Sequence, residues 1–184
     1  MMAALWDSRS DGSVVCRLCA HGCRLRKGAK GVCGVRVNLR GELVSLVSRV
    51  VTAVGMDPVE KKPLYHFLPG TKIFSVGSAG CNFSCQFCQN SSIAQVPENG
   101  IVPGKRAAPE DLLALALSNR ARCIAFTYNE PTVFFELLYE TAGMIAGRHG
   151  DIRRALPRGK AVLGYSCSRR MRAPTALSLC SICS

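Results

Sequence analysis

Three cysteines lie close together in the segment GCNFSCQFCQN, which spans residues 80–90. They are spaced as Cys81-x-x-x-Cys85-x-x-Cys88. Three thiolates on one short loop can bind three corners of an iron–sulfur cube, because each deprotonated sulfur neutralises iron charge. The loop carries no fourth cysteine, so one iron would stay open to a small molecule. The spacing therefore predicts a 4Fe–4S cluster that acts as a catalytic site rather than as an electron carrier.

This segment resembles the signature of radical S-adenosylmethionine (SAM) enzymes, Cys-x-x-x-Cys-x-aromatic-Cys, with Phe87 as the aromatic residue. The whole chain resembles one branch in particular, the AmmeMemoRadiSam system radical SAM enzymes, which are relatives of the activases of pyruvate formate-lyase. The resemblance covers residues from about Cys16 to about Gly147. Its four matching segments are CRLCAHGCRLRKGAKGVCGVR (16–36), DPVEKKPLYHFLPG (57–70), GCNFSCQFCQN (80–90) and FTYNEPT (126–132).

The resemblance implies a site and a reaction. Cys81, Cys85 and Cys88 would bind three irons of the cluster, SAM would chelate the fourth iron, and Phe87 would lie beside the adenine mainly through its backbone. Reductive cleavage of SAM would release a 5′-deoxyadenosyl radical that abstracts hydrogen from a substrate. No catalytic residue is expected beyond the cluster ligands. The expected partners are SAM, a reductant such as flavodoxin or ferredoxin, and an unidentified substrate for which a protein is one candidate.

Asn129-Glu130-Pro131 resembles the Gly-Gly-Glu-Pro segment that binds the amino group of SAM in this family. We therefore expect Asn129 and Glu130 to contribute to SAM binding, because a carboxylate or backbone carbonyls can accept from an ammonium group. The residues themselves also allow a simpler role for Glu130. An acid at the start of a helix is favourably placed in the field of the helix dipole.

Four further cysteines, spaced as Cys16-x-x-Cys19-x-x-x-Cys23 and then Cys33, precede the triplet. This spacing is typical of a metal-stapled knuckle, which would stabilise a segment too small for its own core. We expect a structural metal there, with His21 as a candidate substitute ligand. The alternative is that these cysteines stay reduced and pack as small hydrophobic residues.

Two other functions remain open beside the radical SAM interpretation. The chain could be a noncatalytic iron–sulfur or zinc-binding protein, although zinc usually takes four protein ligands and the triplet offers three. The net charge of +12 also suggests nucleic acid as a partner. Residues 1–147 carry 16 Lys and Arg against 11 Asp and Glu, whereas residues 148–184 carry 8 against 1, so most of the excess is in the tail. That distribution argues against a nucleic-acid surface.

Length and composition bear on the size of the core and on the cellular compartment of the protein. A chain of 184 residues, 48% of them hydrophobic, is long enough to bury a core. Its 11 cysteines would suggest disulfides in a secreted protein, but the start MMAALWDSRSDGSVV does not read as a secretory signal. We therefore expect a reducing, cytoplasmic location with metal or redox chemistry at the cysteines. No stretch of about 18 apolar residues is present, so we expect no membrane span.

The elements that must position the cysteines follow from hydrophobic patterns. Residues 1–15 read as a loose lead-in, and residues 35–54 as a β-hairpin that turns at residues 39–41 and ends before Asp57-Pro58. Residues 60–67 read as a loop that the resemblance places beside the cluster. Lys72–Gly77 and Cys123–Tyr128 are short apolar runs typical of buried parallel strands, with Cys123 in the core. Helices should begin at Pro109 and Pro131.

Two strand–helix units in succession predict an α/β fold. With the resemblance, the expected architecture is the amino-terminal part of a partial (β/α) barrel of radical SAM type, preceded by a small Cys-rich β module. The expected domains are residues 1–70, the Cys-rich module with its hairpin; 71–147, the first two β/α units; and 148–184, a divergent basic tail. We expect the loop after Lys72–Gly77 to lie on the active face, with Gly77 and Gly80 allowing close approach to a ligand.

The resemblance stops after Gly147. Where the family continues with further strand–helix units, this chain has a segment rich in Arg and Ser, and Cys180-x-x-Cys183 at its end supplies only two potential ligands. A barrel needs about 200 residues or more, so the chain reads as truncated. We expect it to keep the cluster loop even if turnover is lost.

Overall fold

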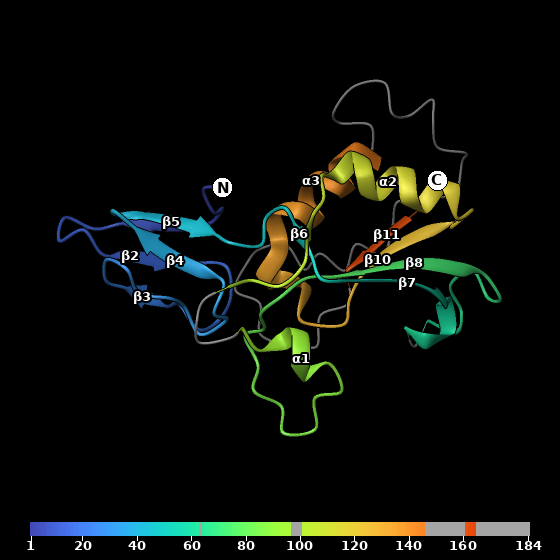
Figure 1. Ribbon diagram of the computed structural model, residues 1–184, viewed down its shortest axis with the longest axis horizontal. Helices are drawn as coiled ribbons and strands as arrows, with labels where there is room; N and C mark the ends of the chain where they lie inside the picture. The colour runs from blue at the N-terminus through green and yellow to red at the C-terminus, as the bar shows by residue number, and fades with distance from the viewer. Residues whose placement is uncertain (63, 97–100, 146–160, 165–184) are drawn as a thin grey trace.

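The computed structural model, shown in Figure 1, describes residues 1–62, 64–96, 101–145 and, as backbone, 161–164. Its main sheet has four strands in the order β11-β10-β8-β7. Strand β8 (Lys72–Gly77) is parallel to β10 (Cys123–Phe126), which is parallel to β11 (Ala161–Gly164). Strand β7 (Ala53–Pro58) runs antiparallel along the other side of β8. The fold is therefore mixed α/β.

The two predicted parallel strands are confirmed, and both are buried. All four residues of β10 are buried, including Cys123 at 2% exposure, and only Lys72 of β8 is exposed. Continuous apolar runs of this kind are expected where helices cover a parallel sheet. Helices α2 (Pro109–Ser118) and α3 (Phe135–Ile145) lie on one side of these strands in Figure 1. The main core lies between them and includes Phe74, Val76, Leu112, Phe126 and Leu137.

Both helices begin where the sequence predicts, with one difference in type. Pro109 is the first residue of α2, and the Asp111 carboxylate accepts a hydrogen bond from the Ala108 N–H at 2.8 Å. Pro131 begins a single 3₁₀ turn, η2 (Pro131–Phe134), before α3 continues from Phe135. A tight 3₁₀ turn is common at a helix amino terminus, where the first N–H groups have no helical partner.

Two strands of the main sheet lie where the sequence analysis expected none. The predicted hairpin over residues 35–54 is shorter, because it consists of β4 (Arg36–Leu39) and β5 (Glu42–Ser45). Strand β7 continues through Asp57 and Pro58, which were expected to lie outside it; Pro58 is tolerated at this end position of an edge strand. Strand β11 lies within the predicted basic tail. The rest of that tail, including Cys180 and Cys183, is outside the described residues.

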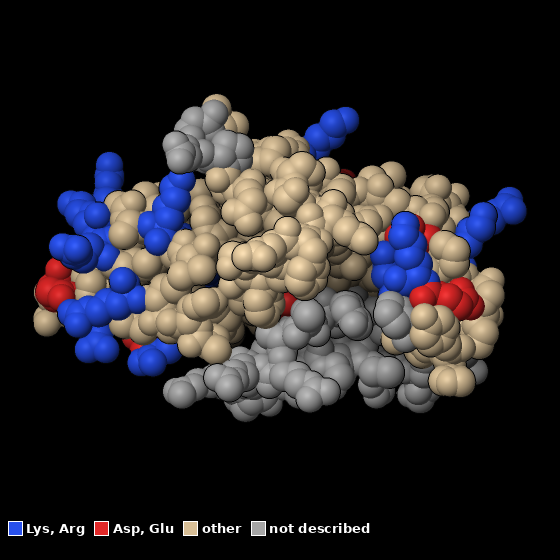
Figure 2. Space-filling view, turned by 90° about the horizontal axis from the view of Figure 1, so that it is seen from below, with Lys and Arg blue, Asp and Glu red and all other residues tan. Residues whose placement is uncertain are grey.

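The expectation of a loose lead-in over residues 1–15 is wrong. Strands β1 (Trp6–Ser8), β2 (Val14–Cys16) and β3 (Arg24–Leu25) form an antiparallel sheet. The three residues of β2 are all buried, in a second core that includes Ala3, Leu18, Leu25 and Leu43. Polar residues between two short apolar runs concealed this hairpin in the sequence. Figure 2 shows Lys and Arg side chains gathered over the end of the molecule that this module forms.

The remaining elements are short. Strands β6 (Val50–Val51) and β9 (Lys105–Arg106) pair with each other, and η1 (Val59–Lys61) and α1 (Ser91–Ala94) are single turns. The strands of the described residues form four separate sheets, none of which closes into a barrel. Over the same residues, no helix has the length and apolar character needed to cross a bilayer.

A buried ion pair joins the Cys-rich module to α3. Arg36, 1% exposed, donates from one guanidinium nitrogen to Glu136 Oε1 at 2.5 Å and from another to the Ala4 carbonyl at 3.0 Å. The same carboxylate oxygen accepts from the Ala4 N–H at 2.8 Å. Phe135 packs against the module's core beside this pair. The module therefore docks on α3 through both apolar and charged contacts.

We expect Glu136→Ala to lower the free energy of unfolding by about 3–5 kcal/mol, because it leaves a buried guanidinium without its countercharge. Equilibrium urea unfolding of the reduced protein measures this loss. The matched control is Asp7→Ala, which breaks the Arg17–Asp7 pair, whose side chains are 57% and 52% exposed. An exposed pair of this kind contributes less than about 1 kcal/mol. Equal losses in the two variants would contradict the prediction.

Candidate functional site

The cysteine triplet lies on the loop that leaves the carboxyl end of β8, as predicted. Gly80, just before Cys81, has φ +84°, and a Cβ there would lie 2.6 Å from both the Cys33 carbonyl oxygen and Val35 Cγ1. Only glycine fits a position with this conformation and this contact. We expected Gly80 to allow close approach to a ligand. The structure shows that Gly80 also allows the loop to pack directly against the Cys-rich module.

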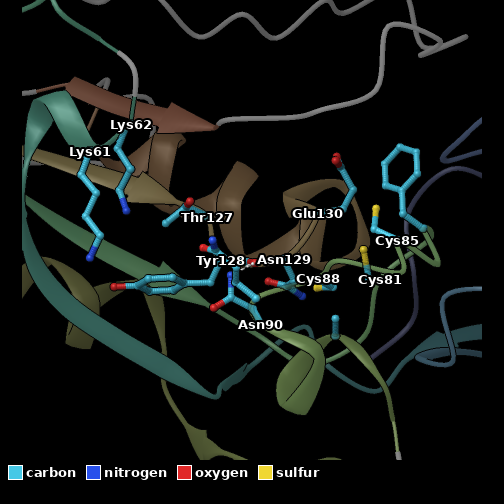
Figure 3. A pocket seen from close by; sticks show the side chains of 13 residues that line it. Lys61, Lys62, Cys81, Cys85, Cys88, Asn90, Thr127, Tyr128, Asn129 and Glu130 are labelled. Carbon is cyan, nitrogen blue, oxygen red and sulfur yellow. Dashed lines mark hydrogen bonds between the residues drawn. The ribbon is translucent and has the colours of Figure 1, made fainter.

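A cavity of about 550 Å³ opens beside this loop. This volume lies within the usual range of small-molecule sites. The cavity is lined by the loop with Ala94 of α1, by the segment after β10, and by Lys61 and Lys62 at the end of η1. Figure 3 shows the lysines at one end, the three cysteines with Glu130 at the other, and Tyr128, Asn129 and Asn90 between them. Its principal residues are Lys61, Lys62, Cys81, Cys85, Cys88, Asn90, Thr127, Tyr128, Asn129 and Glu130.

The three cysteines share this cavity but differ in exposure. Cys85 is exposed, whereas Cys81 and Cys88 are half-buried. Burial raises the pKa of the Cys81 thiol, and backbone N–H groups of Phe83 and Glu130 oppose that shift by donating toward its sulfur. Within residues 1–62, 64–96 and 101–145, no three Cys, His, Asp or Glu side chains are arranged around a single metal ion.

Asn129 fixes the start of the triplet loop. Its amide nitrogen donates to the Gly80 carbonyl at 2.5 Å, and its amide oxygen accepts from the Ser78 N–H at 3.3 Å. The loop residue Asn90 makes a matching contact in the other direction, donating to the Tyr128 carbonyl at 2.8 Å. Two side-chain amides therefore tie the loop after β8 to the segment after β10, and Asn129 borders the cavity.

Glu130 occupies the helix start that the sequence analysis considered for it, and it also borders the cavity. It is 4% exposed and lines the cavity, and it is also the N-cap of η2. Its Oε1 accepts from the Thr132 hydroxyl at 2.5 Å and from the Thr132 N–H at 3.4 Å. The capping role is therefore present in the structure, and the carboxylate lies at the cysteine end of the cavity.

Phe87 is the predicted site residue that the structure does not bring to the cavity with its side chain. The ring is 88% exposed and is absent from the cavity lining. The expectation that Phe87 acts through its backbone beside an adenine is not tested by this arrangement.

The sequence analysis missed a polar network at the other end of the cavity. Of residues 60–67, which the resemblance places beside the cluster, Lys61 and Lys62 line the cavity at the end away from the cysteines. Asp57, on β7, accepts from Lys61 and Lys62 at 2.9 Å each and from the Ser75 hydroxyl at 2.7 Å. Lys61 is exposed as a solvated lysine should be, but Lys62 is 6% exposed. Alternation along β7 places Asp57 on the face opposite the apolar Val54 and Met56, so the pattern gave no signal that Asp57 is buried.

Tyr128 completes this network from the end of β10. Its hydroxyl donates to Asp57 Oδ2 at 3.2 Å, and the Lys62 ammonium lies 4.9 Å from its ring centroid, within cation–π range. Burial and the Asp57 carboxylate both raise the pKa of Tyr128, so the hydroxyl is protonated at neutral pH. Tyr128 has φ +72°, a strained conformation for a non-glycine residue. Strain of this kind persists where surrounding contacts enforce it, often at functional sites.

The four amino-terminal cysteines also come together, in a separate place. Cys16, Cys19, Cys23 and Cys33 all line a small cavity of about 20 Å³ within the module. Burial raises the pKa of the Cys16 and Cys33 thiols. His21, the candidate substitute ligand, borders the same cavity, but its Nε2 donates to the Asn82 carbonyl at 2.9 Å. The four cysteines therefore border one cavity, and the structural metal expected there stays a prediction.

The Asp57 network predicts loss of stability in acid. Burial alone would raise the pKa of Asp57, but hydrogen bonds from Lys62, Lys61 and Ser75 lower it well below its usual range. A lowered folded-state pKa stabilises the fold above the unfolded pKa of about 3.9, and this contribution is lost as the pH falls further. Asp57→Asn should therefore destabilise the protein by about 3–5 kcal/mol at pH 7, since Lys62 loses its buried countercharge.

Urea unfolding of Asp57→Asn and of the unaltered protein between neutral and acidic pH measures the difference between their free energies of unfolding. This difference should narrow as the pH falls through the acidic range. Glu110→Gln, at an exposed position in the first turn of α2, is the control and should stay within about 0.5 kcal/mol of the unaltered protein. If the free energies of unfolding of Asp57→Asn and of the unaltered protein differ by the same amount at every pH, the lowered pKa assigned to Asp57 is refuted.

Comparison with known proteins finds one long match. An uncharacterized protein of Methanocaldococcus jannaschii is 37% identical over 148 residues, which are 80% of this chain and 44% of that relative. No family model matches the chain. No solved structure matches it either. The chain thus spans less than half the length of this archaeal relative.

Proposed function

We propose that this chain carries the cluster-binding part of a radical SAM enzyme. The supporting observation is that Cys81, Cys85 and Cys88 all border one cavity of about 550 Å³ at the carboxyl ends of two parallel strands. Open α/β sheets bind ligands in this position. In this proposal the four-stranded sheet is part of a (β/α) barrel, and the missing walls belong to the portion by which the archaeal relative is longer.

The residues present fit a 4Fe–4S cluster better than a single ion. Cluster ligands bind different iron atoms, so their sulfurs do not converge on one point, whereas structural zinc needs four ligands around one ion. The triplet offers three thiols around a cavity of about 550 Å³, which is much larger than one ion needs. The exposed Cys85 and half-buried Cys81 and Cys88 leave the cavity side of the loop open to such a group.

When bound, the cluster supplies the electron that cleaves SAM reductively, giving methionine and a 5′-deoxyadenosyl radical for hydrogen abstraction. The chain's own residues bind and orient. The three thiolates bind iron, and Asn129 and Asn90 fix the loop that carries them. The Glu130 carboxylate at the cysteine end accepts from the amino group of SAM, in addition to its bond from Thr132.

The partners and compartment follow from this proposal. The reductant is a flavodoxin or ferredoxin, the substrate is hydrogen-bearing and unidentified, and the location is cytoplasmic. The second candidate is a noncatalytic protein in which the triplet binds zinc or iron without reacting with SAM.

We expect anaerobic reconstitution with iron and sulfide to load about four irons per Cys81–Cys88 loop, because each cluster contains four. The visible and electron paramagnetic resonance spectra of the reduced protein should change when SAM is added, since SAM binds the open iron. Product analysis for methionine and 5′-deoxyadenosine then tests cleavage. The full-length archaeal relative should be prepared and assayed in the same way. Cleavage of SAM by that relative alone would mean that the shorter chain has lost turnover, whereas no cleavage by either protein would mean that the chemistry is absent.

The triple variant Cys81→Ala, Cys85→Ala, Cys88→Ala should lose the cluster and the response to SAM. Cys123→Ala is the matched control, because Cys123 is buried in β10 and does not line the cavity. The proposal fails if the triple variant still takes up the cluster, or if the unaltered loop takes up zinc and no iron.

A further inference from the structure

We propose that Cys16, Cys19, Cys23 and Cys33 form a second metal site, which binds one structural zinc ion. This site is separate from the triplet and does not depend on the radical SAM proposal. Its four thiols come from β2, from the turns that precede β3, and from the loop before β4. A juxtaposition of four cysteines drawn from 18 residues requires the chain to fold back on itself around them.

The size of the cavity favours a single ion. It measures about 20 Å³, close to the space that one water molecule needs, whereas the cavity at the triplet measures about 550 Å³. A cube of four irons and four sulfides has no room there. Gly31 lies beside two of these sulfurs, since a Cβ there would be in ordinary van der Waals contact with the Cys23 sulfur at 3.7 Å and the Cys33 sulfur at 3.8 Å.

The donor set favours zinc. Four thiolates in a closed tetrahedral arrangement are typical of structural zinc sites. Backbone N–H groups already point toward two of these sulfurs: that of Leu18 toward Cys16, and those of Val35 and Arg36 toward Cys33. Such donors stabilise a metal-bound thiolate and fix its position, as outer-shell hydrogen bonds do in known metal sites.

Arg36 offers such a site a buried hydrogen-bond donor. Four thiolates and one Zn²⁺ carry a net charge of −2, which burial makes costly unless donors surround the sulfurs; the charge of Arg36 itself is balanced by Glu136. The Arg36 guanidinium lines the cavity and is 1% exposed, and its Nε has no hydrogen-bond partner among the described residues. A buried, unpartnered donor beside four sulfurs is accounted for if the sulfurs become thiolates.

The thiols border the cavity without converging on one point in the described structure. Zinc binding therefore requires the four sulfurs to move together around the ion. The free energy of zinc binding then adds to the free energy of folding of the module. The alternative, four reduced cysteines packed as small hydrophobic residues, needs no such closure and no metal.

The deciding experiment uses the full chain with Cys81→Ala, Cys85→Ala and Cys88→Ala, so that only the amino-terminal site can bind. Elemental analysis after purification should find about one zinc per chain. Replacement of zinc by Co²⁺ should give the intense charge-transfer absorption of a tetrahedral four-sulfur site. Removal of zinc by a chelator should lower the midpoint of thermal unfolding, because metal binding stabilises the folded module.

Ligand variants made in the same background locate the ion. Cys19→Ser with Cys33→Ser should reduce zinc to a small fraction of its value, whereas Cys123→Ala should leave it unchanged. The cobalt spectrum of the protein with all four cysteines decides the matter if the ligand variant fails to fold. Absence of stoichiometric metal, a cobalt spectrum with fewer than four sulfurs, or iron with sulfide in place of zinc would overturn the proposal.

Discussion

Arg36 must find a countercharge inside the protein, and the structure supplies it from a residue 100 positions later, Glu136. A buried guanidinium cannot be left unpaired, so this requirement fixes how the Cys-rich module lies against α3. The docked module then presents Cys33 and Val35 to the loop after β8, where Gly80 fits against them. The position of the cysteine triplet therefore depends on an ion pair that touches none of its three sulfurs.

The candidate site is built from strand ends that side chains fasten together. Asn129 and Asn90 link the two segments that follow β8 and β10, and the Asp57 network fixes the opposite end of the cavity. Parallel strands bring their carboxyl ends to one edge, but loops there have backbone groups that the sheet cannot satisfy. Side-chain amides and carboxylates satisfy these groups, which explains why polar side chains occur in the lining although the strands beneath it are apolar.

Local patterns were sufficient for strands β8 and β10 and for the starts of the two helical segments, because continuous apolar runs and proline at a helix start are properties of short segments. They failed where a long-range partner decides the outcome. The lead-in strands are stabilised by a core that includes Leu43, and Lys62 is buried because Asp57 and Tyr128 surround it. The triplet and the four amino-terminal cysteines were found from spacing alone, whereas the exposure of the Phe87 ring could not be inferred from its place in a motif.

The contact between Gly80 and Cys33 has a thermodynamic consequence. The triplet loop and the Cys-rich module contact each other through their backbones, and the hydrogen bond from His21 to the Asn82 carbonyl extends this contact. Ligands that order either side of such a contact are thermodynamically linked, so each changes the binding affinity of the other by the same factor. An ion that rigidifies the module would raise the affinity of the loop for the loop's own ligand. By reciprocity, that ligand would raise the affinity of the module for the ion by the same factor.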